Sequence, residues 1–250
     1  MDPDFELMAK VRQIHSDTRS SYGSRRISGQ LRDDGYDVGR YRARTLMKKA
    51  GVSVKRRKKF KRTTDSNHKH RIAPNLLNRQ FDVERPNAAW CADITYLWTV
   101  QGWLYLAVVL DLYSRKVVGW ALSNRLTALV VKDALSMAYW RRKPEKGIIH
   151  HSDRGSQYAG GDYQKMLDQY GMICSMSRKG DCWDNAVVES FFHSLKTEWI
   201  ADIIYKTRDE ARADVINYIE MFYNSRRLHS FLGNTNPNSF ENNSSLAKVA

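Results

Sequence analysis

The sequence is poor in cysteine and lacks any apolar segment long enough to cross a membrane. Its 250 residues include three cysteines, at positions 91, 174 and 182, and none of them forms a CxxC pair. An odd number of cysteines without such spacing argues against a disulfide scaffold and fits a reducing compartment. The longest apolar run, residues 103–110, is far too short for a bilayer, and acids stand where a signal peptide would be basic. We therefore expect a cytoplasmic protein without a membrane partner.

Acidic residues are scarce in the first part of the chain. Residues 1–74 hold 20 Lys and Arg against 8 Asp and Glu, which accounts for 12 of the 14 excess positive charges. This asymmetry indicates a region that binds a polyanion, joined to a domain with a different task. Nucleic acid fits better than an anionic membrane, because no strongly apolar face accompanies the basic residues.

Three short helices are predicted at the basic end, over residues 5–17, 24–34 and 39–50, and glycines follow the second and third as caps. The third helix surrounds few apolar positions with basic side chains, as a recognition helix facing DNA does. A solvated basic helix is the alternative. The basic run that follows is expected to lie along a DNA backbone. The candidate DNA contacts here are Arg40, Arg42, Arg44, Lys48, Lys49, Arg56 and Arg57.

The rest of the chain alternates strands and helices. Three strand-like runs, residues 91–99, 103–114 and 116–123, predict an antiparallel meander. Further elements are expected as helix 126–140, strand 147–152, helix 157–169, strand 172–177, and helices 184–200 and 207–224. Three hairpin strands followed by alternating helix and strand predict a mixed α/β sheet of the ribonuclease-H-like class.

Three acids stand inside or at the edge of apolar elements. Asp93 lies in the first predicted strand, where alternation puts it on one face with Cys91 and Thr95. Asp153 directly follows a buried-type strand, at the end where α/β sheets place their ligands, and Glu189 lies on a later helix. Burying each acid without a partner would be costly. Singly, they fit N-caps, ion pairs or solvated positions, whereas the three together favour a shared site.

Three converging carboxylates repel one another, so protons or cations must neutralise them. An oxygen-only ligand set without a Cys or His cluster favours Mg²⁺ or Mn²⁺ over zinc. Two such ions per active site would activate an attacking oxygen and stabilise the leaving one in phosphodiester cleavage. Asp93, Asp153 and Glu189 are therefore the candidate catalytic and metal-binding residues. Asp111, in the second strand, is a rival that is either structural or a neighbour of this site.

The predicted helix 184–200 packs apolar residues inward and carries its acid on another side. Asn185, Glu189 and Lys196 fall on one stripe, because steps of four and seven residues return to nearly the same side of a regular α-helix. Lys196 is expected to reach a phosphate or the DNA next to the reacting bond, and Asn185 is a further candidate DNA contact on this helix. The stripe predicts a helix that offers its acid to metal and its basic residue to DNA.

The loop before this helix has a composition suited to DNA contact. Arg178 and Lys179 supply positive charge, and Trp183 can stack on or wedge beside an unpaired base. A plain surface loop with Trp183 packed into the core is the alternative. Asp184 is expected to be an N-cap, and Asp181 a solvated acid.

Four segments carry a family resemblance: DITYLWTVQGWLYLAVVLDLYSRKVVGW, HSDRGSQY, SRKGDCWDNAVVESFFHSLKTE and YNSRRLHSFLG. Together they resemble the transposases of the IS-three group of bacterial insertion sequences, as products of the second reading frame, whose catalytic domain is similar to retroviral integrase. By this resemblance, Asp93, Asp153 and Glu189 match the family's triad of two aspartates and a glutamate. Lys196 matches the basic residue seven places after the glutamate.

The resemblance implies a ribonuclease-H-like fold, two divalent metal ions, cleavage at element ends to give 3′-OH groups, and strand transfer by those hydroxyls. It implies a bacterial, nucleoid-associated protein that handles DNA as a homo-oligomer, with the upstream-frame product as a fusion partner. We expect a helix-turn-helix-like domain over 1–54, a basic linker over 55–84, an integrase-like catalytic core over 85–241 and a tail over 242–250. Two alternatives stay open. One is a DNA-binding regulator or partial transposase, inactive without its upstream partner, and the other is a nuclease that only hydrolyses.

Overall fold

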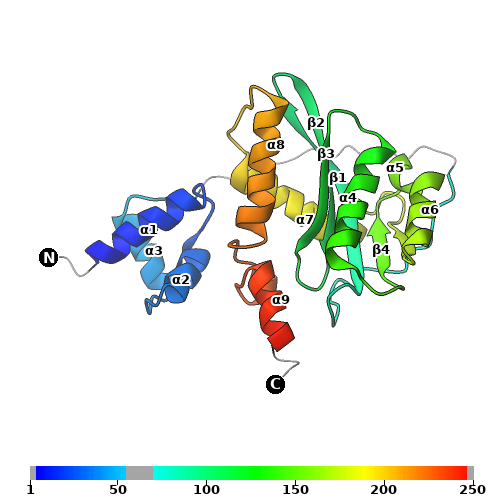
Figure 1. Ribbon diagram of the computed structural model, residues 1–250. Coiled ribbons are helices and arrows are strands. Elements are labelled where there is room, and N and C mark those ends of the chain that lie inside the picture. Colours follow the sequence, from blue (N-terminus) through cyan, green and yellow to red (C-terminus); the bar gives the residue numbers. More distant parts are fainter. Residues whose placement is uncertain (1–3, 55–69, 247–250) are drawn as a thin grey trace. The chain divides into compact units, whose positions relative to one another are not determined.

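The chain folds into two compact units, which the computed structural model describes over residues 4–54 and 70–246. The first unit contains the described part of residues 1–60 together with His193–Ile203 and Leu228–Thr235. The second contains the described part of Lys61–Phe192, then Ile204–Arg227 and the described residues from Asn236 onward. In Figure 1 the N-terminal helices are blue and the first strands are green.

Three helices form the framework of the first unit: α1 (Phe5–Asp17), α2 (Ser24–Asp33) and α3 (Arg40–Lys49). The predicted helices agree with these bounds to within one residue. Gly35 and Gly51 follow α2 and α3 with φ of +90° and +71°, a conformation that glycine adopts without steric strain. Apolar side chains from all three helices form the core, which includes Val11, Ile14, Ile27, Leu31, Ala43 and Leu46.

Two segments from far along the chain complete this unit. Arg19 donates a hydrogen bond to the Trp199 carbonyl at 3.1 Å, and its guanidinium lies 3.8 Å from the centre of the indole ring. The backbone N–H of Leu228 donates to the Tyr22 hydroxyl at 2.8 Å. The short elements in these segments are the π-helical η2 (Leu195–Trp199) and the 3₁₀ turn η4 (Ser230–Leu232).

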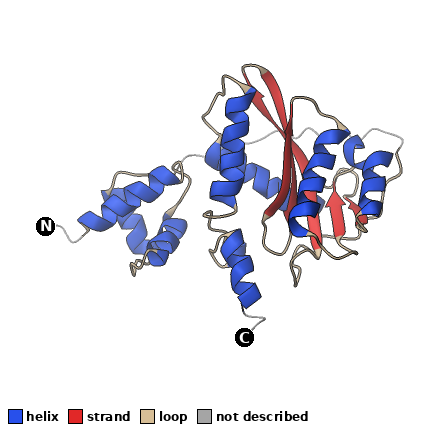
Figure 2. Cartoon of the chain, viewed as in Figure 1, coloured by secondary structure: helices blue, strands red, loops and turns tan. Residues whose placement is uncertain are grey.

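A five-stranded sheet in the order β3-β2-β1-β4-β5 forms the centre of the second unit (Figure 2). β1 and β2 pair antiparallel, as do β2 and β3, whereas β4 pairs parallel with both β1 and β5. The predicted mixed sheet with an initial meander is therefore confirmed. The strands are β1 (Ala89–Thr99), β2 (Gly102–Asp111), β3 (Val117–Ser123), β4 (Ile149–Ser152) and β5 (Ile173–Met176).

Alternation along β1 separates the two faces of the sheet, as the sequence predicts. Ala92 and Ile94 face a buried core shared with the helices between β3 and β5, so Cys91, Asp93 and Thr95 point to the opposite side. In Figure 1, α7 and α8 lie on that opposite side of the sheet from α4. The helices on the core side are α4 (Ala128–Arg142), α5 (Ser156–Ala159) and α6 (Gly161–Gln169).

The later helices change between 3₁₀, α and π geometry along their length, whereas the sequence predicts two regular α-helices. A 3₁₀ turn, η1 (Cys182–Asn185), leads into α7 (Ala186–Ser194), and the chain then continues with the π turns of η2. In the same way, α8 (Arg208–Asn217) passes into the π-helical η3 (Tyr218–Tyr223). The last helix, α9 (Pro237–Leu246), starts behind Asn236, whose side chain accepts the N–H of Ser239 at 2.9 Å. No helix in residues 4–54 and 70–246 is long and apolar enough to cross a membrane.

Candidate active site

The parallel pairing of β1 and β4 brings two of the predicted acids to adjacent positions. Ala92 pairs with Ser152, so Asp93 and Asp153, the next residue on each segment, are neighbours across the strand pair. Both side chains are half-buried. Asp93 Oδ1 accepts the next residue's N–H at 2.7 Å, and Asp153 Oδ1 accepts the N–H two residues on at 2.9 Å. Backbone donors therefore orient both carboxylates.

The pKa of the buried Tyr158 is influenced by both acids at this edge of the sheet. Burial raises the pKa of Tyr158 well above its usual value, and Tyr163 and then the Asp93 and Asp153 carboxylates raise it further. Both acids therefore contribute negative potential at one buried side chain. Tyr158 stays protonated at neutral pH.

Two buried histidines precede Asp153 on β4. Burial lowers the pKa of His150 to about 3 and that of His151 to about 4, so both are neutral near pH 7. Nε2 of His150 lies 3.0 Å from the Tyr163 hydroxyl, and Nδ1 of His151 lies 2.8 Å from Ser175 Oγ. These rings are packed and hydrogen-bonded, and they add no positive charge beside the acids.

Helix α7 carries the third acid. Asn185, at its start, donates from Nδ2 to the Ala92 carbonyl at 3.3 Å, which ties the beginning of the helix to β1 beside the first acid. Glu189 lies four residues further, about one helical turn, and is exposed. Val188 and Phe191 are buried on the other side of the helix. The helix thus packs its apolar side and leaves its acid accessible.

The structure does not place Asn185, Glu189 and Lys196 on one stripe of a regular α-helix, as the sequence predicted. Asn185 is only 4% exposed, whereas Glu189 is exposed. Lys196 lies in η2, where π winding breaks the regular spacing on which the stripe was based. Lys196 also belongs to the first unit, whereas Glu189 belongs to the second. Contact between Lys196 or Asn185 and DNA stays a prediction.

The donor set at this edge fits a hard divalent cation in kind. Asp93, Asp153 and Glu189 offer only carboxylate oxygens, which Mg²⁺ and Mn²⁺ prefer. Within the described ranges, no three His, Cys, Asp or Glu side chains form a group that could hold a metal ion as they stand. The structure brings Asp93 and Asp153 to neighbouring positions. A site shared by all three acids stays a prediction.

Asp184 is the centre of a buried ion-pair network, where the sequence predicts a helix N-cap. Its side chain is fully buried and receives three bonds from Arg178, from N at 2.8 Å, Nε at 3.0 Å and Nη2 at 2.8 Å. Arg79 Nε donates at 2.9 Å and Asn75 Nδ2 at 2.8 Å. Hydrogen bonds from Arg178, with Arg79, hold the pKa of this carboxyl far below its usual range. We call these four residues the Asp184 cluster.

The rest of this loop differs from expectation in two ways. Asp181, expected to be solvated, caps η1 by accepting the Trp183 N–H at 3.3 Å and forms an ion pair with Arg79. Trp183 is 67% exposed, so the alternative in which it packs into the core is wrong. Lys179 is exposed as well. DNA contact by Trp183, Lys179 and Arg178 stays a prediction, with Arg178 already engaged by the Asp184 cluster.

Helix α3 presents its basic residues outward. All five of its predicted DNA contacts are exposed, while Ala43, Leu46 and Met47 are buried. Asp4 pairs with Lys49 at 2.6 Å and with Arg42 at 3.4 Å. The exposed basic residues are Arg40, Arg42, Arg44, Lys48 and Lys49. Two further predicted contacts, Arg56 and Arg57, lie outside the described residues.

Asp111 belongs to a structural ion-pair network that the sequence did not reveal. Its side chain is fully buried and pairs with Arg142 at 3.0 Å. It also accepts the backbone N–H of Asn87 at 2.9 Å and that of Tyr113 at 3.0 Å. Arg142 in turn pairs with Glu241 of α9 at 2.8 Å. The hypothesis that Asp111 is a structural residue is therefore the one that the structure supports, because both of its carboxylate oxygens accept hydrogen bonds from these donors.

Comparison with known proteins gives matches along most of the chain. The family model described as an integrase core domain matches residues 83–182, and a second one with the same description matches 189–245. A model described as an HTH-like domain matches residues 2–60. The HTH-like match and the two integrase-core matches cover different parts of the chain.

Relatives at 45% identity cover nearly the whole chain. One is the insertion element IS600 uncharacterized 31 kDa protein of Shigella sonnei, over 237 residues, 95% of this chain and 87% of the relative. Another is the transposase InsF for insertion sequence IS3A of Escherichia coli K12, over 225 residues, 90% of this chain and 78% of the relative.

The fold has a counterpart among solved structures. The intasome of simian T-cell lymphotropic virus, in complex with PP2A regulatory subunit B56 gamma, contains a chain that matches with a TM-score of 0.55. The match covers 92% of this chain and 74% of that one at 15% sequence identity, so it concerns the fold alone. The predicted ribonuclease-H-like class is confirmed at this level.

Proposed function

The chain belongs to the IS3 family of insertion-sequence transposases, and we propose that it cuts element ends and joins them to target DNA at the edge formed by Asp93 and Asp153. One observation carries the proposal. The register of β1 and β4 makes these two acids neighbours, and Asn185 ties the start of α7, which holds Glu189, to the residue before Asp93. The arrangement supports a shared site for all three carboxylates.

In this proposal Asp93, Asp153 and Glu189 would hold two Mg²⁺ or Mn²⁺ ions. Bound there, the ions would activate the attacking oxygen and stabilise the leaving oxygen of a phosphodiester. The chain's own part is to orient the carboxylates, which the backbone donors to Asp93 and Asp153 support.

The proposed reaction has two steps, and each of them acts on a phosphodiester bond. In the first, water attacks a phosphorus at the element end, the bond to the 3′-oxygen breaks, and that oxygen leaves as a 3′-OH. In the second, this hydroxyl attacks a phosphorus of the target, forms the new phosphodiester and releases a target 3′-OH. Each step exchanges one phosphorus–oxygen bond for another, so no oxidant, reductant or covalent enzyme intermediate is needed.

DNA contacts are assigned to both units. The outward-facing basic residues of α3 support its role as a recognition helix, and the HTH-like match covers the same residues. Exposed Trp183 and Lys179 are proposed to contact DNA beside the reacting bond. We further propose that the protein acts as a homo-oligomer, because two DNA ends must be brought together, with the upstream-frame product as a fusion partner.

A cleavage and joining assay tests the proposal. The full chain is incubated with labelled element-end duplex and a target plasmid, with Mg²⁺, with Mn²⁺ and with neither, in the presence and absence of the upstream-frame product. We expect cut ends and joined products that depend on the metal. Asp153→Asn keeps the side chain's size but removes its charge, and it should lower both products by at least about 100-fold, the loss expected when an essential charged group is removed from a metal site.

The matched control is Asp162→Asn, an exposed acid at the start of α6 in the same unit. It should leave both products unchanged. Cut ends without joined products would support a hydrolytic nuclease instead. If native protein yields neither product even with the upstream-frame product, the enzymatic proposal fails and a DNA-binding regulator remains.

A further inference from the structure

A basic hollow lies in the second unit, away from the carboxylate edge. It has a volume of about 260 Å³ and lies between residues 85–87, which lead into β1, and residues 142–148, which join α4 to β4. Its walls carry Arg85, Arg142, Lys143 and Lys146 against a single acid, Glu145. Residues 75–250 as a whole hold 21 Lys and Arg against 19 Asp and Glu. The local excess therefore does not follow from the composition of this part of the chain.

Arg142 is held in place by its hydrogen bonds and ion pairs, and the stem of Lys146 lies against the opposite loop. Arg142 Nε donates to Asn87 Oδ1 at 2.9 Å, and its guanidinium also bonds Asp111 and Glu241. The aliphatic stem of Lys146 packs closely against Gly171 on the opposite loop. A Cβ at position 171 would come 2.6 Å from Lys146 Cγ, so only glycine leaves room for this stem. A fixed cation such as Arg142 loses little conformational entropy when an anion binds.

Three of the four cations in the hollow have no ion-pair partner in the described part of the chain. Asp111 and Glu241 balance Arg142, but within the described residues Arg85, Lys143 and Lys146 have no ion-pair partner. A cation at position 143 also stabilises the C-terminal end of α4 through the helix dipole. That effect does not account for Arg85 or Lys146, which lie outside the helix. A concave surface that carries three cations without an ion-pair partner against one lining acid attracts and concentrates anions.

We propose that this hollow, the basic pocket, binds a backbone phosphate of DNA. The inference rests on the proposed function, which makes DNA the substrate. The basic pocket precedes β4 and Asp153 follows it, so the four residues of the strand separate them by about 13 Å at roughly 3.3 Å per residue. The basic pocket is thus a second DNA contact, distinct from the cutting edge. A phosphate contact of this kind fixes the position of the duplex without reading its sequence.

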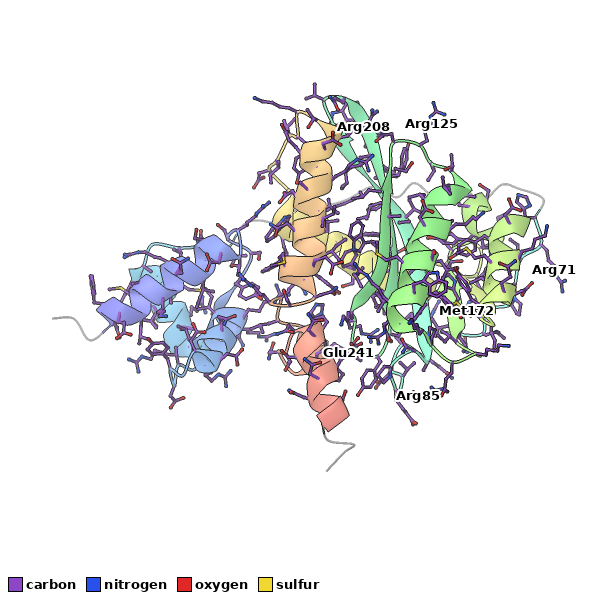
Figure 3. The ribbon with its side chains drawn as sticks, viewed as in Figure 1. Arg71, Arg85, Arg125, Met172, Arg208 and Glu241 are labelled. Carbon is purple, nitrogen blue, oxygen red and sulfur yellow. The ribbon has the colours of Figure 1, made fainter. Side chains whose placement is uncertain are left out.

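The test is the salt dependence of DNA binding by the full chain without divalent metal. Fluorescence anisotropy is measured from 50 to 200 mM NaCl with an element-end duplex and with an unrelated duplex. The variant replaces Lys143 and Lys146 with Gln. Its matched control replaces Arg125 and Lys165 with Gln, two exposed cations of the same unit. Figure 3 labels Arg125 at the end of the sheet away from Arg85.

If one phosphate contact is lost, the slope of log K against log salt should become shallower by about 0.9, for both duplexes alike. Over this fourfold range of salt, binding by the pocket variant would then weaken about 3.5-fold less than binding by native protein. The control should keep the native slope. Equal slopes for native protein and pocket variant would overturn the proposal.

Free phosphate is the other source of the same chemistry, and a thermal-shift titration with inorganic phosphate separates it from DNA. If phosphate stabilises native protein more than the pocket variant while the DNA slopes stay equal, the basic pocket serves the free anion and the DNA assignment fails. The outcome is independent of catalysis. A changed slope with no cut DNA would overturn the proposed function alone, and cut DNA with an unchanged slope would overturn the basic pocket alone.

Discussion

Replacing Asp184 with Asn should destabilise the protein far more than the same change at its neighbour Asp181. The substitution keeps the shape of the side chain but turns one acceptor oxygen into an amide donor. Oδ1 accepts from Arg79 Nε and Arg178 Nη2, and Oδ2 accepts from Asn75 and from Arg178 N and Nε. Whichever way the new amide turns, it faces at least two donors in a buried site.

The size of the effect follows from the surroundings of this carboxylate. Removing one partner of a buried ion pair costs about 3–5 kcal/mol, because the other charge is left without compensation. Here the cations are less buried than the acid, since the side chains of Arg178 and Arg79 are 48% and 44% exposed. Water can hydrate them when the acid is lost, so we expect about 2–3 kcal/mol. Asp181 is 26% exposed, and its replacement by Asn should cost less than about 1 kcal/mol.

Urea unfolding of the two variants at pH 7 measures the difference, and hydrogen exchange at the Arg178 amide, which donates to Asp184 at 2.8 Å, reports on the loop itself. Acid gives a second readout. The folded-state pKa of Asp184 lies below its ordinary value of 3.8, so its stabilisation is present above that pH and is lost as the pH falls below it. The gap between native protein and the Asp184 variant should therefore narrow in acid. A variant no less stable than the Asp181 control, or a gap that stays constant to low pH, would refute the reasoning.

Two further predictions concern packing and positioning. Gly119→Ala should destabilise the second unit by at least about 2 kcal/mol in urea unfolding, because its Cβ would lie 2.2 Å from the Ala134 carbonyl oxygen of α4. Gly161→Ala, where no atom lies within 4 Å of the new Cβ, is the control that should be nearly neutral. Asn185→Ala should slow strand joining at saturating DNA at least about tenfold, because α7 loses its bond to β1. Joining at the native rate would show that Asn185 does not position Glu189.

Local pattern was enough to predict most of the helices and strands of both units. The alternation that put Asp93 opposite Ala92 is the alternation seen in β1, and the position of Asp153 directly after a short buried strand made it the neighbour of Asp93. Glycine with φ of +90° and +71° ends α2 and α3 where the sequence places their caps. These features depend on residues that are close together in the chain, so they can be predicted from local sequence.

What the sequence could not reveal depends on distant partners. Asp184 lies two residues before α7 and so resembles an N-cap in the sequence, but its partner Arg79 lies 105 residues earlier. Asp111 and Arg142 are likewise joined only in the folded protein, 31 residues apart. The π turns of η2 and η3 have no distinct residue pattern, so a regular helix was the natural expectation. The helix at α9 had a signal that could have been found, since Asn236 before Pro237 is a typical start.

The composite make-up of the first unit restricts how this protein can evolve. Its three N-terminal helices depend on residues near 199 and 228, where Trp199 meets Arg19 and Leu228 meets Tyr22. Recombination at a single breakpoint near residue 60 would combine the helices of one parent with the residues near 199 and 228 of the other, so contacts such as that of Trp199 with Arg19 would have to match between the parents. With α3 as the proposed recognition helix, new DNA specificity is therefore more accessible through point substitutions on the outer side of α3 than through exchange of a module between relatives.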